Sequence, residues 1–298
     1  MTGWICIDKP EGLTSFTAAN RVRGILGLKK TGHTGTLDPM ATGVLPIALS
    51  GTTRFIELLP VHEKAYTARV RLGLTTDTLD ITGQVLSTAA VNVTPSEIEA
   101  AANAFLGESL QTPPMYSALR QNGVRLYELA RRGESVERPQ RKIQITDITV
   151  SNMDMTENEF TLTVACSAGT YIRSLADDIG KKLGCGAVLT ALRRTSANGF
   201  TLENCITLEE LEQLRDENRV EEVILKADAP LAAFPALTVT AAQSVRFSNG
   251  GSLLRARVGN PKMGYYRVYD PMQKFLGLGE VESDASDSLS VKRVFVDG

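Results

Sequence analysis

A short stretch rich in glycine and proline, residues 32–46, constrains the backbone of this chain more than any other segment. Its sequence is GHTGTLDPMATGVLP, with three glycines and two prolines. Glycine reaches positive φ at little cost, whereas proline fixes φ and lacks an N–H donor. The one acid in the stretch, Asp38, precedes Pro39 and is therefore restricted to an extended or turn conformation. The stretch predicts a stiff loop that presents Asp38, followed by a buried strand over residues 43–50.

The chain is long enough for one large domain and a smaller one. It has 298 residues, of which 43% are hydrophobic, which suffices for an extensive core. No apolar run approaches the ~20 residues of a membrane span, and the first residues lack the basic start and cleavage site of a signal peptide. We therefore expect a cytoplasmic protein without a membrane partner.

The cysteines do not suggest a disulfide or a metal site. Cys6, Cys166, Cys185 and Cys205 are scattered along the chain without a C-x-x-C pair. This spacing predicts neither a disulfide framework nor a zinc site. The chain has only two histidines, His33 and His62, so we expect no transition-metal site.

Charge is distributed unevenly along the chain. Residues 203–228 contain nine acids and three bases, a local balance of −6, so the rest of the chain carries +4. Residues 120–142 contain seven bases and three acids. A basic run of this kind is typical of a solvated surface as well as of a phosphate-binding one, and by itself it does not decide between them.

Hydrophobic periodicity predicts an α+β fold. Alternation over residues 66–72 is typical of a half-buried strand with Tyr66 facing inward, and capping boxes at Thr94 and Thr207 predict helix starts. Further strands are predicted over residues 4–8, 143–150, 160–167 and 187–194, and further helices from Ser15 or Thr17 to Gly27 and over residues 172–183. Residues 1–235 should form a mixed, mainly antiparallel β-sheet domain with flanking helices. The short strands that follow predict a small β domain over residues 236–298.

Two polar residues are unusual for their positions. An Asp before Pro in a glycine-rich loop is most often a turn residue. If Asp38 is functional, it could be a nucleophile, a general base or a metal ligand, and the lack of nearby His, Cys or carboxylate partners weakens the last of these. Arg173 is predicted in the first turn of a helix, where the macrodipole disfavours a cation. A carboxylate partner would favour it there, and the candidates are Asp177, four residues on, and Asp38.

Several ordered motifs then identify a family. They are DKPEGLTS at residues 8–15, HTGTLDPMATG at 33–43, KAY at 64–66, MYSAL at 115–119, GTYIRSL at 169–175 and LRR at 192–194. With these motifs, the chain closely resembles the TruB-type tRNA pseudouridine-55 synthases over roughly residues 3–195. Its tail after about residue 235 resembles, less distinctly, their small PUA-like domain.

The resemblance implies an enzyme that converts uridine to pseudouridine at position 55 in the T-loop of tRNA, without cofactor or metal. By the same resemblance, Asp38 forms a covalent intermediate, Arg173 pairs with it, and Tyr66 stacks on the flipped uracil. His33 occupies the opened T-loop, Leu192 provides an apolar wall, and Tyr171 supports Arg173 or the pocket. Lys9 and Lys64 are candidates for phosphate contacts, and residues 236–298 for an RNA-binding domain.

Some alternatives stay open at this level. A non-catalytic RNA-binding module would bind RNA without turnover, and an Asp-dependent N-glycoside hydrolase would need a second carboxylate, for which Asp77 or Asp80 are the nearby candidates. The residue types do not decide whether Asp38 attacks C1′, eliminates there to a glycal, or adds at C6. We expect the T-arm of tRNA as partner and a monomeric protein.

Overall fold

The computed structural model describes residues 1–296 and divides into two compact units. Unit 1 comprises Met1–Asp38, Val44–Val61 and the chain from Asn198 on, and unit 2 comprises Pro39–Gly43 and His62–Ala197. The peptide bond between Asp38 and Pro39 is therefore one of the places where the chain passes from one unit to the other. Within the described residues, no helix is long and apolar enough to cross a membrane.

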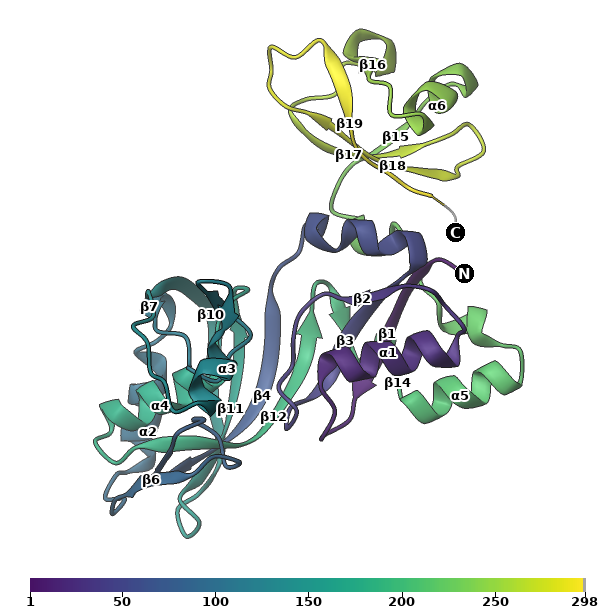
Figure 1. Ribbon diagram of the computed structural model, residues 1–298. Helices are drawn as coiled ribbons and strands as arrows, with labels where there is room; N and C mark the ends of the chain where they lie inside the picture. Colours follow the sequence, from purple (N-terminus) through teal and green to yellow (C-terminus); the bar gives the residue numbers. More distant parts are fainter. Residues whose placement is uncertain (297–298) are drawn as a thin grey trace. The chain divides into compact units, whose positions relative to one another are not determined.

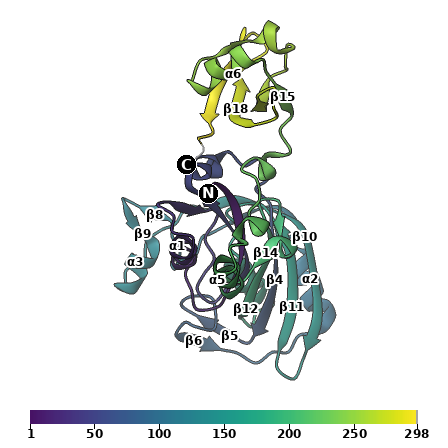
Figure 2. The ribbon, with the colours of Figure 1, turned by 90° about the vertical axis from the view of Figure 1, so that its right-hand side faces the viewer.

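Unit 2 is built on an antiparallel sheet with the strand order β12-β4-β11-β10-β7. Helix α4 packs on β12 and β4, and α2 packs on β10; β10 and β11 run side by side in Figure 2. The strands are β4 (Lys64–Leu72), β7 (Gly107–Gln111), β10 (Arg141–Asp154), β11 (Glu159–Cys166) and β12 (Ala187–Ala197), and the helices are α2 (Pro95–Asn103), α3 (Leu126–Arg131) and α4 (Ile172–Lys182). Two small hairpins pair β5 (Leu74–Thr76) with β6 (Val85–Thr88) and β8 (Arg120–Gln121) with β9 (Val124–Arg125).

Strand β4 confirms the predicted alternation. Tyr66, Ala68, Val70 and Leu72 are buried, whereas the residues between them are half-buried. On the opposite face, Arg69 and Arg71 each form a 2.7 Å ion pair with Glu159 of β11. Strand β4 therefore presents an apolar face to the core and a charged face to solvent.

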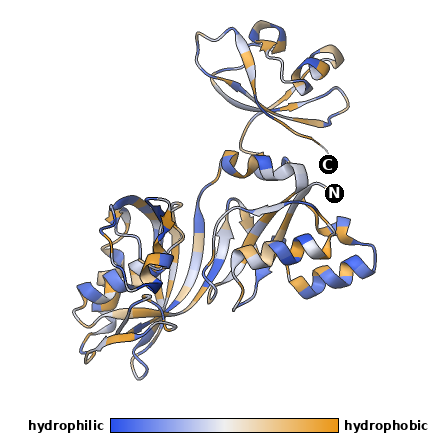
Figure 3. Ribbon diagram, in the orientation of Figure 1, coloured by the Kyte–Doolittle hydropathy of each residue, from blue (hydrophilic) through white to orange (hydrophobic). Residues whose placement is uncertain are grey.

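Unit 1 contains the sheet strands around β1, on which two helices pack. Figure 1 shows α1 and α5 lying side by side, and both helices carry hydrophilic and hydrophobic residues in Figure 3. Ile5, Ile7, Val22, Leu45 and Leu208 belong to the core that they cover. The elements are β1 (Gly3–Lys9), α1 (Ser15–Ile25), β2 (Thr31–His33), β3 (Thr42–Leu49, which begins in unit 2), η1 (Ser50–Leu58), β13 (Phe200–Thr201), η2 (Leu202–Asn204), β14 (Cys205–Ile206), α5 (Leu208–Asp216), η3 (Val220–Val223) and η4 (Ala229–Leu231).

The chain after residue 235 forms a five-stranded sheet with the order β15-β17-β18-β19-β16. Phe247, Val268 and Leu289 belong to its own hydrophobic core. Its elements are β15 (Ala236–Thr238), α6 (Ala241–Ser248), β16 (Leu253–Leu254), η5 (Arg255–Val258), β17 (Gly264–Tyr269), β18 (Phe275–Val281) and β19 (Ser288–Val294). The α+β class predicted from the sequence, with a small C-terminal β domain, is thus confirmed.

Gly43 is required at the start of β3, where Thr42 and Gly43 pair in parallel with Arg193 and Arg194 of β12. Its φ is +101°, and a Cβ atom there would lie 2.2 Å from the Arg194 carbonyl oxygen. Residues with side chains rarely adopt this conformation, and backbone cannot move aside as a flexible side chain can. Only glycine allows β3 to approach β12 this closely.

We expect Gly43→Ala to lower the free energy of unfolding by about 3 kcal/mol or more, because positive φ and the steric clash both contribute. Gly199→Ala is the matched control, since Gly199 has a φ of +83° and a Cβ added there would have no atom within 4 Å; it should cost about 1 kcal/mol. Urea unfolding followed by circular dichroism measures both. Equal losses would contradict the steric explanation.

Candidate active site

The loop that carries Asp38 is fixed at both ends within unit 1. At its start, β2 pairs with β3, with His33 opposite Ile47, and the Thr34 N–H donates to the Pro46 carbonyl. Near its end, the buried Ser15 hydroxyl accepts from the Leu37 N–H (2.7 Å) and donates to the Leu37 carbonyl (3.2 Å). Asp38 follows directly and is half-buried, as is His33. The backbone beside Asp38 is therefore held in place while its side chain stays accessible.

Lys9, a predicted phosphate contact, is completely buried. Its Nζ donates to the carbonyls of Pro10 (2.8 Å) and Leu13 (2.7 Å), just before α1 begins. A buried ammonium is stabilised by such acceptors. This geometry gives Lys9 a structural role in the turn between β1 and α1, and a phosphate could reach it only after a rearrangement.

Tyr66 and Leu192 lie on one face of the unit 2 sheet. Tyr66 of β4 is paired with Arg194 of β12, and Ala68 with Leu192. Directly paired residues project to the same face, as do residues two apart on one strand. Tyr66 is 6% exposed and Leu192 7%. A flat aromatic ring and an apolar side chain therefore share a face with the Arg194 side chain.

Lys64 precedes Tyr66 by two residues on β4 and shares its face. Burial lowers the pKa of the Lys64 ammonium, and repulsion from Arg194 lowers it further. The charge on Lys64 is thus disfavoured in the folded protein relative to the unfolded chain. A nearby anion, such as an RNA phosphate, would compensate for this cost.

Arg173 is buried, with 4% of its surface exposed. Its Nη1 donates to the Thr78 carbonyl and its Nη2 to the Tyr116 carbonyl, each at 2.8 Å. These acceptors lie in two different connecting segments, far from α4 in the sequence. The guanidinium, in the first turn of α4, is therefore held in a defined orientation by main-chain atoms.

Asp80 is the carboxylate that the sequence did not predict for this environment. Its Oδ2 lies 3.8 Å from Arg173 Nη1, and its Oδ1 accepts from Thr78 Oγ1 (2.8 Å), Thr82 N (3.0 Å) and Thr82 Oγ1 (2.5 Å). Asp177, the candidate four residues after Arg173, instead pairs with Lys181 at 2.5 Å. The sequence held one signal for a buried Asp80, namely the threonines two residues before and after it. Hydroxyls at this spacing can donate hydrogen bonds to a buried carboxylate.

Tyr171 precedes α4, and its backbone is bound by a buried side chain. Gln111 Oε1 accepts from the Tyr171 N–H (2.8 Å), and Gln111 Nε2 donates to the Tyr171 carbonyl (3.1 Å). Gln111 is 3% exposed and lies at the end of β7. A single glutamine thus connects β7 to the start of the helix that carries Arg173.

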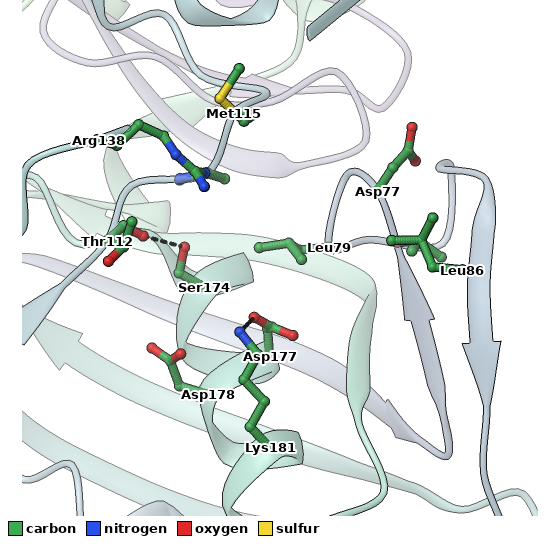
Figure 4. A pocket seen from close by; sticks show the side chains of 12 residues that line it. Asp77, Leu79, Leu86, Thr112, Met115, Arg138, Ser174, Asp177, Asp178 and Lys181 are labelled. Atoms are coloured by element: carbon green, nitrogen blue, oxygen red, sulfur yellow. Dashed lines mark hydrogen bonds and ion pairs between the residues drawn. The ribbon is translucent and has the colours of Figure 1, made fainter. Parts of the chain in front are cut away.

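A cavity of about 300 Å³ lies in unit 2 beside α4 (Figure 4). Ser174, Asp177, Asp178 and Lys181 line it from the helix, with Asp77, Leu79, Leu86, Thr112, Met115 and Arg138 among the other lining residues. The Ser174 hydroxyl donates to the Thr112 carbonyl at 3.2 Å. Burial raises the pKa of the Asp178 carboxyl, and Asp177 raises it further against the opposing effect of Lys181. The predicted site residues are not among the residues that line this cavity.

The structure thus places the predicted residues in two groups. Lys64, Tyr66, Tyr171, Arg173 and Leu192 belong to unit 2, on the sheet face or at the start of α4. Lys9, His33 and Asp38 belong to unit 1. Among residues 1–296, no group of three or more His, Cys, Asp or Glu side chains is arranged to hold a metal ion.

The Gln111 contact leads to a prediction about α4. Gln111→Met keeps the side-chain volume but removes both hydrogen bonds to Tyr171, so the free energy of unfolding should fall by about 1–2 kcal/mol. Gln84→Met is the control, because Gln84 is exposed and its change should stay within about 0.5 kcal/mol. Denaturant unfolding checks both variants, and a Gln111→Met protein as stable as the wild type would refute this role.

Comparison with known families gives three consecutive matches. The profile described as TruB family pseudouridylate synthase (N terminal domain) matches residues 23–172. The profile of the tRNA pseudouridylate synthase B C-terminal domain matches residues 173–232, and that of pseudouridine synthase II TruB, C-terminal, matches residues 235–295. Together they account for most of the chain in the order expected from its motifs.

Individual proteins similar to this chain carry names consistent with these family matches. The chain is 43% identical over 286 residues to tRNA pseudouridine synthase B of Clostridium novyi, covering 94% of this chain and 95% of that protein. It is also 43% identical over 287 residues to the protein of the same name from Stutzerimonas stutzeri, covering 95% and 93%. A solved structure of a Cbf5-Nop10-Gar1 complex is similar with a TM-score of 0.76 and 26% identity, covering 99% of this chain and 85% of that one. The chain belongs to the TruB family of pseudouridylate synthases.

Proposed function

We propose that this protein isomerises uridine to pseudouridine at position 55 in the T-loop of tRNA. The observation that carries the proposal is the match, over nearly its whole length, to relatives named tRNA pseudouridine synthase B. The arrangement of the site is consistent with it, since an accessible acid lies on a fixed loop and a buried guanidinium at the start of α4. The alternatives of a non-catalytic RNA-binding module and an N-glycoside hydrolase are not favoured.

The reaction breaks the N1–C1′ glycosidic bond, rotates the uracil and forms a C5–C1′ bond. We assign the covalent step to the Asp38 carboxylate, which acts as the nucleophile while the base is reoriented. The hydrogen bonds between Ser15 and Leu37 restrict the backbone next to this carboxylate. A nucleophile held on a rigid loop loses little conformational freedom when the substrate binds.

Arg173 is assigned to orient Asp38. Its guanidinium is already fixed by the Thr78 and Tyr116 carbonyls, so its other N–H donors are preorganised for a carboxylate. A charge-assisted hydrogen bond to Asp38 would keep the acid ionised and correctly directed. Tyr171, two residues before Arg173, supports this arrangement through the start of α4.

Tyr66 is assigned to the flipped base. A uridine inside the tRNA fold must be extruded before it can react, at a cost of a few kcal/mol in lost stacking. Stacking on an aromatic ring returns about 1–3 kcal/mol per base, and Leu192 on the same sheet face provides an apolar neighbour. We further assign Tyr66 to the departure of the C5 proton, which must leave before pseudouridine is complete.

The remaining assignments concern RNA binding. We assign His33 to occupy the space left by the extruded base and Lys64 to contact a phosphate. Residues 236–298 are proposed as a small PUA-like RNA-binding domain that completes a catalytic domain of residues 1–235. We further propose that the protein acts as a monomer in the cytoplasm, needing no cofactor.

The role of Asp38 is tested by tritium release from tRNA that carries C5-labelled uridine. The wild type should release tritium, and Asp38→Asn and Asp38→Ala should release it at least about 10³-fold more slowly, because the covalent step is lost. Asp154→Asn, which alters an exposed acid at the end of β10, beside the turn to β11, is the control and should keep most activity. Release that survives in both Asp38 variants would remove Asp38 from the mechanism.

The role of Tyr66 is tested by separating turnover from binding. Tyr66→Leu should reduce turnover by at least about 10²-fold but weaken tRNA binding by less than about tenfold, because its contact is made in the flipped state. Tyr66→Phe keeps the ring and removes the hydroxyl, so it shows whether stacking alone suffices. Single-turnover kinetics and filter binding provide the two measurements. Parallel losses of turnover and binding would argue against the assignment.

A further inference from the structure

Two cysteines that are far apart in the sequence meet in unit 1. Cys6 of β1 and Cys205 of β14 are separated by 199 positions, yet their Sγ atoms lie 3.1 Å apart. They are paired partners in parallel strands, in register at Cys6↔Cys205 and Ile7↔Ile206. Adjacent strands are about 4.8 Å apart, which falls within the Cα separation that a disulfide requires. The two thiols are therefore placed for a direct covalent link.

We propose that Cys6 and Cys205 form a peroxide-sensitive dithiol that oxidises to an intrachain disulfide. The two sulfur atoms differ in accessibility, because Cys205 is half-buried and Cys6 is 1% exposed. An accessible thiol beside a buried one is the arrangement in which the first reacts with the oxidant and the second resolves the product. Neither cysteine forms a disulfide in the structure.

The reaction consumes one hydroperoxide. The Cys205 thiolate attacks the peroxide, an S–O bond forms as the O–O bond breaks, and a sulfenic acid results with release of water or an alcohol. Cys6 Sγ then attacks the sulfenic sulfur, forming the S–S bond and releasing water. Each thiol supplies one of the two electrons that reduce the peroxide and one of the two protons that its oxygens take up.

The other two cysteines are not arranged to react with peroxide and form a disulfide. Cys166 has no exposed surface, and burial raises the pKa of its thiol to about 11, so little reactive thiolate is present at neutral pH. Cys185 is 7% exposed and has no thiol neighbour among the contacts seen in residues 1–296. Oxidation should therefore be selective for one pair.

The link would strengthen one edge of the unit 1 sheet. Strand β14 contains only Cys205 and Ile206 and lies at the end of the strand order. It leads directly into α5, whose Leu208 and Leu211 pack in the core with Ile5 and Ile7. A disulfide that closes so long a loop restricts the unfolded chain strongly. Oxidation should thus stabilise the packing of α5 on β1.

The test treats reduced, full-length protein with hydrogen peroxide, blocks remaining thiols by alkylation and maps peptides without reduction. A linked pair containing Cys6 and Cys205 should appear, about 2 Da lighter than the two reduced peptides together, and a dithiol reductant should reverse it. The thermal unfolding midpoint of the oxidised protein should rise by about 5 °C. Absence of the linked pair after peroxide treatment would overturn the proposal, as would a link formed only between two chains.

Cysteine variants test which thiol reacts with peroxide and which one resolves the sulfenic acid. In Cys6→Ser the sulfenic acid on Cys205 should persist and be trapped by dimedone, whereas in Cys205→Ser the Cys6 thiol should stay reduced. Cys185→Ser is the matched control and should form the link normally. Cys6→Ala replaces Cys6→Ser if the latter does not fold. None of these measurements depends on the proposed isomerase activity.

Discussion

A buried guanidinium has to be matched by acceptors, and in this protein that requirement organises unit 2 around Arg173. Its partners include backbone carbonyls in two connecting segments, at Thr78 and Tyr116, with the Asp80 carboxylate nearby. Burying a charge is costly unless it is hydrogen-bonded, so these segments are held against the start of α4 as long as Arg173 is present. The Asp80 carboxylate is itself hydrogen-bonded by Thr78 and Thr82.

The catalytic role assigned to Asp38 requires an accessible side chain, whereas Arg173 is buried. A nucleophile has to be accessible, so its rigidity cannot come from burial of its own side chain. It comes instead from its neighbours, because Ser15 binds both backbone groups of Leu37 and β2 pairs with β3 at the other end of the loop. The motif around Lys9 and Ser15 therefore supports the motif around Asp38 through the backbone, whereas Arg173 is fixed within the other unit.

The proposed pairing of Cys6 and Cys205 depends on strand topology and cannot be read from the spacing of cysteines in the sequence. Cys6 and Cys205 have no sequence pattern in common, and neither lies in a motif of the family. They become neighbours because β14 adds to the edge of the sheet beside β1. Cys166 and Cys185, which are equally scattered, are buried without a thiol neighbour in the described part of the chain, and this difference makes the proposed oxidation selective.

The sequence by itself determined the α+β class, the strand pattern of β4, the capping boxes and the loop of Asp38, because these depend on local periodicity, on glycine and proline, and on neighbouring hydrogen bonds. It also determined the family, through motifs that keep their order. Only the tertiary structure decided that Lys9 is buried in a turn, that Asp177 pairs with Lys181 and that Asp80 approaches Arg173. These outcomes depend on contacts between segments far apart in the chain, where burial and competition among partners decide which ion pair forms, and no local pattern encodes that competition.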